Sequence, residues 1–211
     1  MSQPKIYDCF CYFNEDMLLK LRLETLWNTV DYFVISEASY SHAGNDRETL
    51  FDINKFSKYA EKIRYLRLDE KPPGENDFWK NENFIRNNLV KGLSDAQAND
   101  LILISDLDEI PNPSVIKSYQ PKFLRGDFSQ RYYSYFFNNF WLGDVDKNGN
   151  IKPSSNIWLG SKITTYQYFT TFFNSNATSV RSYKSSGLLR AIKRNWFKKF
   201  NVQSIANGGW H

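Results

Sequence analysis

The chain has 211 residues, of which 41% are hydrophobic and 24% are charged, and this balance excludes a disordered or collagen-like protein and suits one domain with a sizeable core. Aromatic residues make up an unusual 17%, and the charge is uneven along the chain. Residues 1–105 hold 13 Lys and Arg against 17 Asp and Glu, whereas residues 106–211 hold 14 against 6, with the last carboxylate at Asp146. The basic second half favours a phosphate-bearing ligand, a nucleic acid or an anionic membrane surface as partner.

The first half of the chain alternates short apolar strands with helices. Strand patterns cover residues 5–13, 32–36, 63–68 and 101–104, and helical spacing or capping signals cover residues 14–30, 56–62 and 78–93. Polar or proline-containing segments lie at residues 39–47 and 71–74. This alternation predicts an α/β fold with a mostly parallel sheet flanked by helices. Residues 101–104, LILI, are typical of a central parallel strand that is buried on both faces.

The second half has a different texture. Residues 131–141 and 163–173 are dense in aromatic side chains and predict β ribbons that continue the same domain. No apolar run approaches the roughly 18 residues that cross a bilayer, and no secretory leader is visible, so we expect a cytoplasmic protein. Cys9 and Cys11 lie on one face of a predicted strand, in poor geometry for a mutual disulfide, and we expect them to pack as reduced thiols.

The sharpest motif is the acidic string SDLDEIP at residues 105–111, which directly follows the LILI strand. Ligand crevices of open α/β sheets lie at the carboxyl ends of the strands. Asp106 and Asp108 can point at one site there, and packed carboxylates favour a hard divalent cation such as Mn²⁺ or Mg²⁺, which in turn bridges to phosphates. A solvated acidic turn with a helix cap is the alternative to this metal site.

Several strings together resemble a known family. ISDLDEIP, the preceding FWKNENFIRNNLVKGL and VISEASYSHAG, and the opening YDCFCYFNEDMLLKLRLETLW are similar to glycosyltransferase family 17, the β-1,4-mannosyl-glycoprotein β-1,4-N-acetylglucosaminyltransferase family. The resemblance implies a GT-A-like, Rossmann-type fold, a nucleotide-sugar donor, a divalent metal and an inverting transfer. On this basis residues 1–110 are expected to form a nucleotide-binding half and residues 111–211 an acceptor-side half of one domain. The final GGWH resembles an internal segment of the family, so the second half is expected to be truncated or the chain to be a short member.

The family pattern also suggests roles for residues around the acidic string. Asp108 would bind the metal directly, Asp106 would contact the ribose or the metal through water, and His211 would complete the metal shell. A frayed terminus is the alternative for His211. Glu109 would support the residues that bind the metal or act as a catalytic carboxylate, and a helix cap is its alternative. His42 lies in a loop where it is exposed or touches the donor.

Five further residues are expected at the nucleotide sugar. Glu37 ends the second strand and would hydrogen-bond the base or ribose, and Arg47 would contact the diphosphate. Glu82 and Arg86 lie four residues apart on the predicted helix 78–93, with Asn83 beside them. Their alternatives are a loop cap for Glu37 and an exposed ion pair of small energetic effect for Glu82 and Arg86.

An inverting transfer needs a base that deprotonates the acceptor hydroxyl. Asp144 and Asp146 are the candidates for this base, and Asp144 is the first of them, because Asp146 fits a plain turn better. Alternatively, the base would come from a further C-terminal segment. Tyr135 and Trp141 head a set of aromatic residues expected to offer a platform to the acceptor sugar; the others are Tyr133, Phe137 and Trp158. The basic stretch at residues 190–199 would neutralise the leaving diphosphate or face a membrane.

These observations favour a metal-dependent glycosyltransferase with a UDP-sugar donor, N-acetylglucosamine as the expected sugar, a glycan or sugar acceptor and no nucleic-acid partner. Two other classes stay open. A non-catalytic module for anionic glycans or nucleic acids would use the basic, aromatic second half. A metal-dependent nucleotidyltransferase or phosphodiesterase would also use paired carboxylates.

Overall fold

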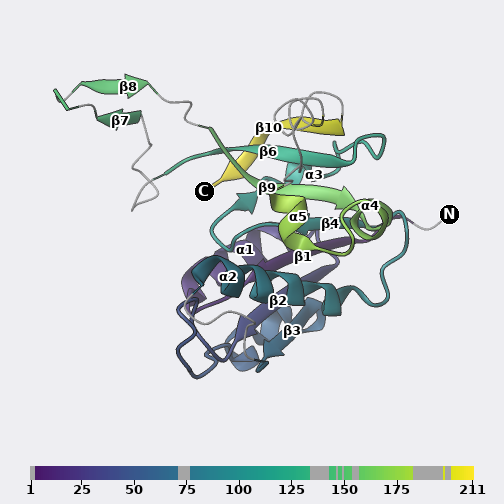
Figure 1. Ribbon diagram of the computed structural model, residues 1–211. Helices are drawn as coiled ribbons and strands as arrows, with labels where there is room; N and C mark the ends of the chain where they lie inside the picture. The colour runs from purple at the N-terminus through teal and green to yellow at the C-terminus, as the bar shows by residue number, and fades with distance from the viewer. Residues whose placement is uncertain are drawn as a thin grey trace.

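The computed structural model describes residues 3–70, 77–133, 143–145, 147–148, 150–153, 157–182, 197 and 201–211. Its centre is an eight-stranded sheet in the order β3-β2-β1-β4-β9-β6-β10-β5, and β7 and β8 form a separate antiparallel pair (Figure 1). The strands are β1 (Ile6–Cys11), β2 (Tyr32–Ala38), β3 (Ile63–Leu68), β4 (Leu101–Ile104), β5 (Ile110–Pro111), β6 (Arg125–Arg131), β7 (Gly143–Val145), β8 (Ile151–Pro153), β9 (Ile157–Thr165) and β10 (Val202–Trp210). The helices are α1 (Asp16–Leu26), η1 (Ile53–Lys62), α2 (Phe78–Asn87), η2 (Asn88–Leu93), α3 (Pro113–Ile116), α4 (Tyr166–Thr171) and α5 (Ala177–Arg181).

The sheet has a parallel half and a mixed half. β1 pairs in parallel with β2 and β4, and β2 pairs in parallel with β3, which confirms the predicted α/β fold. β9 runs antiparallel to both β4 and β6, and β10 runs parallel to β6. Strands from both sides of residue 110 therefore lie in one sheet, while the division into a nucleotide-binding half and an acceptor-side half stays a prediction.

Helices cover both faces of this sheet, and two apolar clusters fill the spaces between the layers. α1, η1 and α3 pack on one face, where Leu23 and Phe128 are fully buried. η2, α4 and α5 pack on the other, where Phe169 is fully buried. Ile102 and Leu103 enter different clusters because successive side chains of a strand point to opposite faces. This confirms that the LILI strand is buried on both faces. Among the described residues, no helix is both long and apolar enough to traverse a bilayer.

One predicted element is wrong. Residues 163–173 do not form a single β ribbon, because β9 ends at Thr165 and α4 begins at the next residue. The Thr165 side chain caps the helix by accepting a hydrogen bond from the backbone N of Tyr168 at 3.2 Å. Phe169 of α4 and Phe173 of the turn that follows it both enter the core on the same side of the sheet, so the aromatic residues after Thr165 do not alternate as in a strand. Of the other predicted ribbon, residues 131–141, all but residues 131–133 lie outside the described residues.

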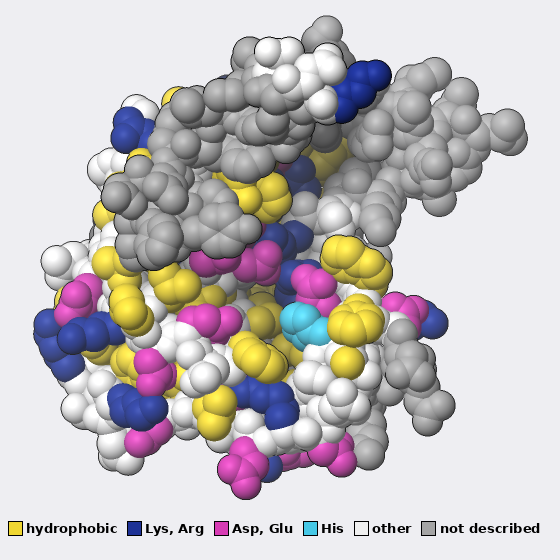
Figure 2. All heavy atoms as spheres, turned by 90° about the vertical axis from the view of Figure 1, so that its left-hand side faces the viewer, with side chains coloured by type: hydrophobic (Ala, Val, Ile, Leu, Met, Phe, Trp, Pro, Cys, Tyr) yellow, Lys and Arg dark blue, Asp and Glu magenta, His cyan; other side chains and the backbone are white. Residues whose placement is uncertain are grey.

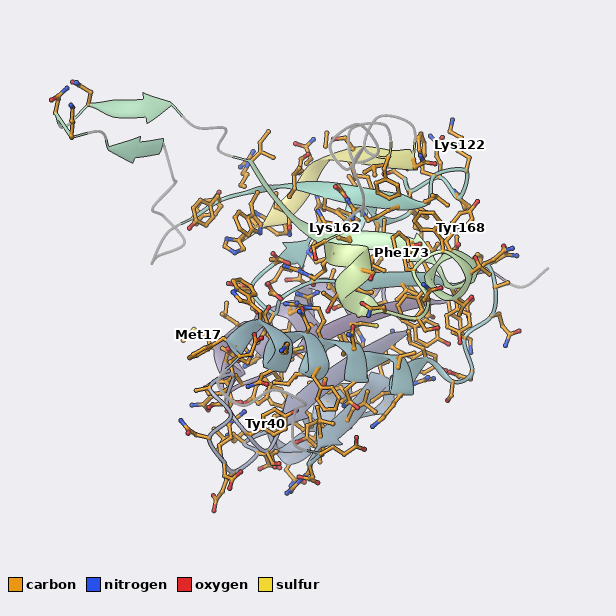
Figure 3. All side chains as sticks on the ribbon, viewed as in Figure 1. Met17, Tyr40, Lys122, Lys162, Tyr168 and Phe173 are labelled. Atoms are coloured by element: carbon orange, nitrogen blue, oxygen red, sulfur yellow. The ribbon has the colours of Figure 1, made fainter. Side chains whose placement is uncertain are left out.

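A charged group is buried on the α5 side of the sheet. Lys162 of β9 lies opposite Asp127 of β6, with Lys162 Nζ 3.4 Å from Asp127 Oδ2, and Arg125 donates to the same oxygen at 3.0 Å (Figure 3). Lys162 Nζ also donates to the backbone oxygen of Leu159 at 2.7 Å. Burial lowers the pKa of the Lys162 ammonium to about 8, although Asp127 opposes the shift.

This low pKa predicts a pH-dependent stability. The pKa rises from about 8 in the folded chain to the ordinary 10.5 on unfolding, so between these values the unfolded chain binds more protons. The free energy of unfolding is therefore expected to increase with pH across that window, by about 3 kcal/mol for this group. Urea unfolding at pH 7.5 and pH 10 measures it. Lys162→Met is expected to remove this part of the rise, and Lys58→Met, at an exposed position, is expected to retain it. A rise of equal size in both variants would contradict the assignment.

Candidate functional site

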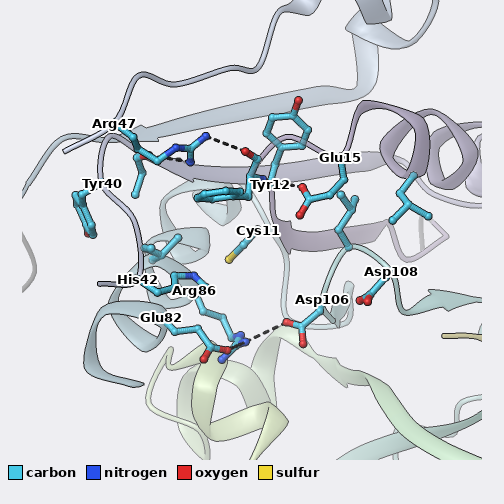
Figure 4. A pocket seen from close by; sticks show the side chains of 15 residues that line it. Cys11, Tyr12, Glu15, Tyr40, His42, Arg47, Glu82, Arg86, Asp106 and Asp108 are labelled. Carbon is cyan, nitrogen blue, oxygen red and sulfur yellow. Dashed lines mark hydrogen bonds and ion pairs between the residues drawn. The ribbon is translucent and has the colours of Figure 1, made fainter. Parts of the chain in front are cut away.

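A pocket of about 370 Å³ opens where β1, β2 and β4 end (Figure 4). Apolar and charged side chains are mixed in its lining. The apolar ones include Tyr12, Phe13, Leu18, Ala38, Tyr40 and Ile85. The charged ones include Glu82, Arg86, Asp106 and Asp108 on one side, and Glu15 and Arg47 on the other, beside Tyr12 and Phe13. Figure 2 shows the face on which acidic and basic side chains lie side by side around a histidine and next to hydrophobic groups. The acidic string thus lies at the sheet edge where sequence reasoning expected a crevice.

Asp106 lies between two arginines. Its Oδ1 accepts from Arg86 Nη2 at 3.0 Å, and its Oδ2 accepts from Arg181 Nη2 at 2.7 Å. Arg86 also pairs with Glu82 one helical turn earlier, as the spacing predicted. The Arg86 side chain is only 8% exposed. The Glu82–Arg86 pair is therefore not an exposed surface ion pair, which was the alternative to a role in the site. The structure therefore brings Glu82, Arg86 and Asp106 together at one edge of the pocket.

Glu109 is fully buried and serves as an anchor. Its carboxylate accepts from the backbone N of Asp106 at 2.8 Å, from the Trp158 indole at 2.7 Å and from both terminal nitrogens of Arg181. Burial alone would raise the pKa of Glu109, but Arg181 and the Trp158 indole hold it below its ordinary value. A buried carboxylate with a lowered pKa and four donors is a poor general base. The geometry therefore does not support the catalytic role expected for Glu109 and favours the supporting role, the positioning of the acidic loop.

A buried ion pair beneath the loop sets its shape. Arg22 of α1 and Asp8 of β1 are both 0% exposed and bond through two contacts of 2.6 and 2.8 Å. Arg22 Nη1 then donates to the backbone oxygens of Asp106, Leu107 and Glu109 at 3.0 to 3.1 Å. Because these backbone carbonyls point inward to the Arg22 guanidinium, the Asp106 and Asp108 side chains point outward, toward the pocket. Arg22 is therefore the residue that gives the acidic loop its conformation.

Asp108 and His211 meet at the outer end of the loop. Asp108 Oδ2 lies 3.7 Å from His211 Nε2, and the Asp108 side chain is half exposed. The His211 ring packs against Trp158 and Tyr132, with centroid distances of 4.6 and 4.9 Å. Gly209 has a φ of +126° and would bring a Cβ within 2.1 Å of the Ile110 oxygen, so only glycine lets β10 approach β5 closely enough. His211 is thus held in place by neighbouring strands and rings and is not a frayed end.

These residues fit a divalent cation in part. Within the described ranges, no cluster of three or more His, Cys, Asp and Glu side chains forms a ready cation cage. Burial and the charges of Glu109 and Asp106 raise the pKa of Asp108, with His211 opposing the shift. The buried Nδ1 of His211 has no hydrogen-bond partner among the residues that the structure describes. Asp108 and His211 therefore suit two ligands of one cation. Asp106 does not suit a direct ligand in this arrangement, because an arginine occupies each of its oxygens.

Glu37 lies behind the pocket. It is fully buried, and its carboxylate accepts from Arg47 at 2.8 Å, from the Tyr65 hydroxyl at 2.9 Å and from the backbone N of Leu50 and Phe51. The expected contact of Glu37 with base or ribose is not supported, because protein donors take both oxygens. Arg47 does line the pocket, as expected, with its guanidinium 4.0 Å from the centre of the Phe13 ring.

Three more expectations concern the pocket walls. His42 lines the pocket. Asn83 does not, because it faces a second pocket on the other side of α2. Cys11 lines the pocket, but burial raises the pKa of its thiol to about 12, so the nucleophilic thiolate is scarce there.

The remaining expected residues are not described in full. Tyr135, Trp141, Asp146 and the basic stretch at residues 190–199, except Phe197, lie outside the described residues. Asp144 is in β7, where only the backbone is described. Their roles stay predictions.

Sequence reasoning missed Arg22, Asp8 and Arg181, and considered Trp158 only as part of a platform. A signal existed for Arg22, because it follows Leu19 by three residues and precedes Leu26 by four, on the apolar face of α1. A charged residue on the buried face of a helix needs a buried partner of opposite charge, and Asp8, within the apolar first strand, is such a residue. No local pattern distinguishes Arg181.

A sequence model of glycosyltransferase family 17 matches residues 1–145 of the chain. The β-1,4-mannosyl-glycoprotein 4-β-N-acetylglucosaminyltransferases of Homo sapiens and Rattus norvegicus are each 32% identical to it over 103 residues. The alignment covers 44% of this chain and 19% of theirs, so the chain matches about a fifth of the length of these curated relatives.

Similarity to solved structures is weaker. S. aureus TarS aligns over 96% of this chain and 57% of its own, at 12% identity and a TM-score of 0.48. The mannosyltransferase PcManGT from Pyrobaculum calidifontis, in complex with GDP-Man and Mn²⁺, aligns over 62% of this chain and 37% of its own, at 14% identity and a TM-score of 0.38. Both TM-scores are below 0.5, so neither likeness carries weight beside the family match.

Proposed function

The chain belongs to glycosyltransferase family 17, and from this premise we propose that it transfers a sugar from a UDP-sugar to a hydroxyl of a glycan acceptor. The observation that carries the proposal is the pocket at the strand ends, which Asp106 and Asp108 line together with two arginines and several apolar side chains. N-acetylglucosamine is the proposed sugar, in line with the names of the relatives.

The mixed lining of the pocket suits a nucleotide diphosphate. The base and ribose would lie against aromatic side chains such as Phe13 and Tyr40, because flat rings pack favourably on them. The diphosphate would lie beside the acidic loop, with Arg86 on one side of the pocket and Arg47 on the other. Bidentate guanidinium groups suit phosphate oxygens, and these arginines are already held by Glu82 and Glu37.

Asp108 and His211 would hold a divalent cation, Mn²⁺ or Mg²⁺, at the diphosphate. When bound, the cation would offset the negative charge that develops on the leaving diphosphate. Arg86 and Arg181 would add positive charge around the same group, and Asp106 would keep the two guanidinium groups apart and correctly aimed.

The proposed chemistry is a single displacement with inversion. The acceptor hydroxyl oxygen forms a bond to the anomeric carbon, the bond from that carbon to the diphosphate oxygen breaks, and UDP leaves with the bonding pair. The hydroxyl proton passes to a carboxylate, for which Asp144 is our candidate. Trp158 is 40% exposed beside the acidic loop and would offer the acceptor an aromatic face.

Calorimetric titration of UDP, with and without Mn²⁺, tests the proposal. We expect Mn²⁺ to increase the affinity for UDP at least about tenfold, because two phosphates and two protein ligands share the cation. Release of UDP from UDP-GlcNAc in the presence of an acceptor then identifies a transferase, whereas a nucleoside monophosphate product would identify the nucleotidyltransferase or phosphodiesterase class. Equal affinity for UDP in both titrations would refute the metal-dependent donor site.

A further inference from the structure

A second pocket lies on the other side of α2 from the candidate donor site. Its volume is about 460 Å³, a size typical of sites for small ligands. α2, the turn after α4 and helix α5 form its walls, and α2 and α5 lie side by side in Figure 1. None of the described residues lines both this pocket and the donor pocket.

Among the described residues, the lining of this second pocket is polar but uncharged. It consists of four asparagines, three hydroxyl side chains and two phenyl rings, with no Asp, Glu, Lys, Arg or His among these described side chains. Because 24% of the whole chain is charged, such a lining is distinctive. No described lining side chain carries a charge that would offset the desolvation of an ionic ligand, and a wholly apolar ligand would strip water from the amides without replacing their hydrogen bonds.

The amide groups have donors to spare. Asn83 Oδ1 accepts from the Thr178 hydroxyl and Asn87 Oδ1 from the Thr178 backbone N, both at 3.1 Å. Asn176 Oδ1 accepts from the backbone N of Ser179 at 2.8 Å. The fold thus uses the oxygen of three of the four amides, those of Asn83, Asn87 and Asn176, while the nitrogens of these three make no hydrogen bond within the described ranges. These donors are held in fixed positions, because the oxygens bond the Thr178 hydroxyl or backbone N–H groups at the start of α5.

An aromatic ring completes the lining. Phe172 is 38% exposed. Its ring packs at right angles to that of Phe173, with 5.0 Å between the centroids, and stacks on that of Phe197, with 5.8 Å between the centroids. Phe173 itself is buried in the core and anchors this turn (Figure 3). A pyranose ring offers an apolar face to such a ring and hydroxyls to amides at its edge. From these observations we infer that the second pocket binds a neutral saccharide unit, separately from the nucleotide sugar.

This inference goes beyond the proposed function and does not require it. α5 links the two sites, since Thr178 lies at the second pocket and Arg181, one turn further along, bonds Asp106 and Glu109. A saccharide held against α5 would therefore lie next to the helix that reaches the donor site.

Saturation-transfer NMR tests the inference with three probes: N,N′-diacetylchitobiose, methyl α-mannoside and, as a charged control, glucuronic acid. UDP and Mn²⁺ are added in excess to fill the donor pocket, and their binding is measured on the same sample. We expect transfer to at least one neutral saccharide at millimolar concentration, unaffected by UDP, and none to glucuronic acid. The absence of transfer to both neutral sugars, or its loss on addition of UDP, would overturn the inference.

Two variants locate the binding. Ser182→Trp fills the pocket mouth from an exposed position and is expected to weaken saccharide binding at least about tenfold. Ser118→Trp is the matched control, because Ser118 is also exposed and its hydroxyl also donates to a carbonyl of the preceding turn, but it follows α3 on the other face. Phe172→Leu keeps apolar bulk without a flat ring and is expected to weaken binding about fivefold. Unchanged binding in Ser182→Trp would overturn the inference. Saccharide binding without UDP binding would instead refute only the donor-site proposal.

Discussion

Asp108→Asn is expected to lower sugar transfer with Mn²⁺ by about 10³-fold, the size of loss seen when a group that stabilises developing charge is removed. Asp108 is the acidic side chain that lies within 3.7 Å of His211, and no arginine contact offsets its charge within the described residues. An amide of the same shape retains the packing of the loop but binds divalent cations weakly.

Folding stability separates this loss from a structural one. Burial and the neighbouring carboxylates raise the pKa of Asp108, so its charge is unfavourable in the folded chain. Asp108→Asn is therefore expected to leave the free energy of unfolding unchanged or slightly higher at pH 7, while Mn²⁺ no longer strengthens UDP binding. Thermal unfolding and UDP calorimetry measure the two effects. Glu61→Gln, on exposed η1, is the control and is expected to change neither. Turnover of Asp108→Asn within threefold of the parent would exclude the cation role.

Arg22→Met is expected to destabilise the fold by about 3–5 kcal/mol, because it leaves the Asp8 carboxylate buried without its partner. Three loop carbonyls lose their donor in the same change, so the acidic loop is also expected to loosen. For a chain of this length the melting temperature is expected to fall by about 10 °C. Urea or thermal unfolding measures the loss.

An exposed ion pair supplies the matched control. Arg67 and Asp69 bond at 2.7 Å, but their side chains are 55% and 61% exposed, so Arg67→Met is expected to cost less than about 0.5 kcal/mol. Combining Arg22→Met with Asp8→Leu removes both charges and is expected to recover most of the stability. It is not expected to restore UDP affinity, since the loop carbonyls stay without a donor. A loss below 1 kcal/mol for Arg22→Met alone would show that the pair does not support the loop.

Local patterns predicted the first half of the fold well. β1 to β4, α1 and α2 follow from short apolar runs and helical spacing, because such signals depend on residues close in the chain. The acidic string was also placed at a strand end from its position after LILI. In contrast, α4 was mistaken for strand because aromatic residues favour both states until a cap such as Thr165 is recognised.

Long-range partnerships explain what was missed at the site. The bonds from Arg22 to the acidic loop span more than 80 residues, and the bond from Arg181 to Glu109 spans 72. Neither partner carries a local sign of the other. The residue types in the pocket could be predicted, but whether a carboxylate points into it or into the protein could not, as Glu37 and Glu109 show.

The position of β10 has a consequence for synthesis on the ribosome. β10 is inserted between β6 and β5, so residues 202–210 fill an inner place in the sheet after the other nine strands described here have been made. Until then β6 presents an unpaired edge, which is a template for pairing with other chains. The nascent protein therefore passes through a stage in which α1, β1 and β2 can already be packed while the other end of the sheet is open. Chaperone capture and aggregation during synthesis are expected to concentrate in that interval.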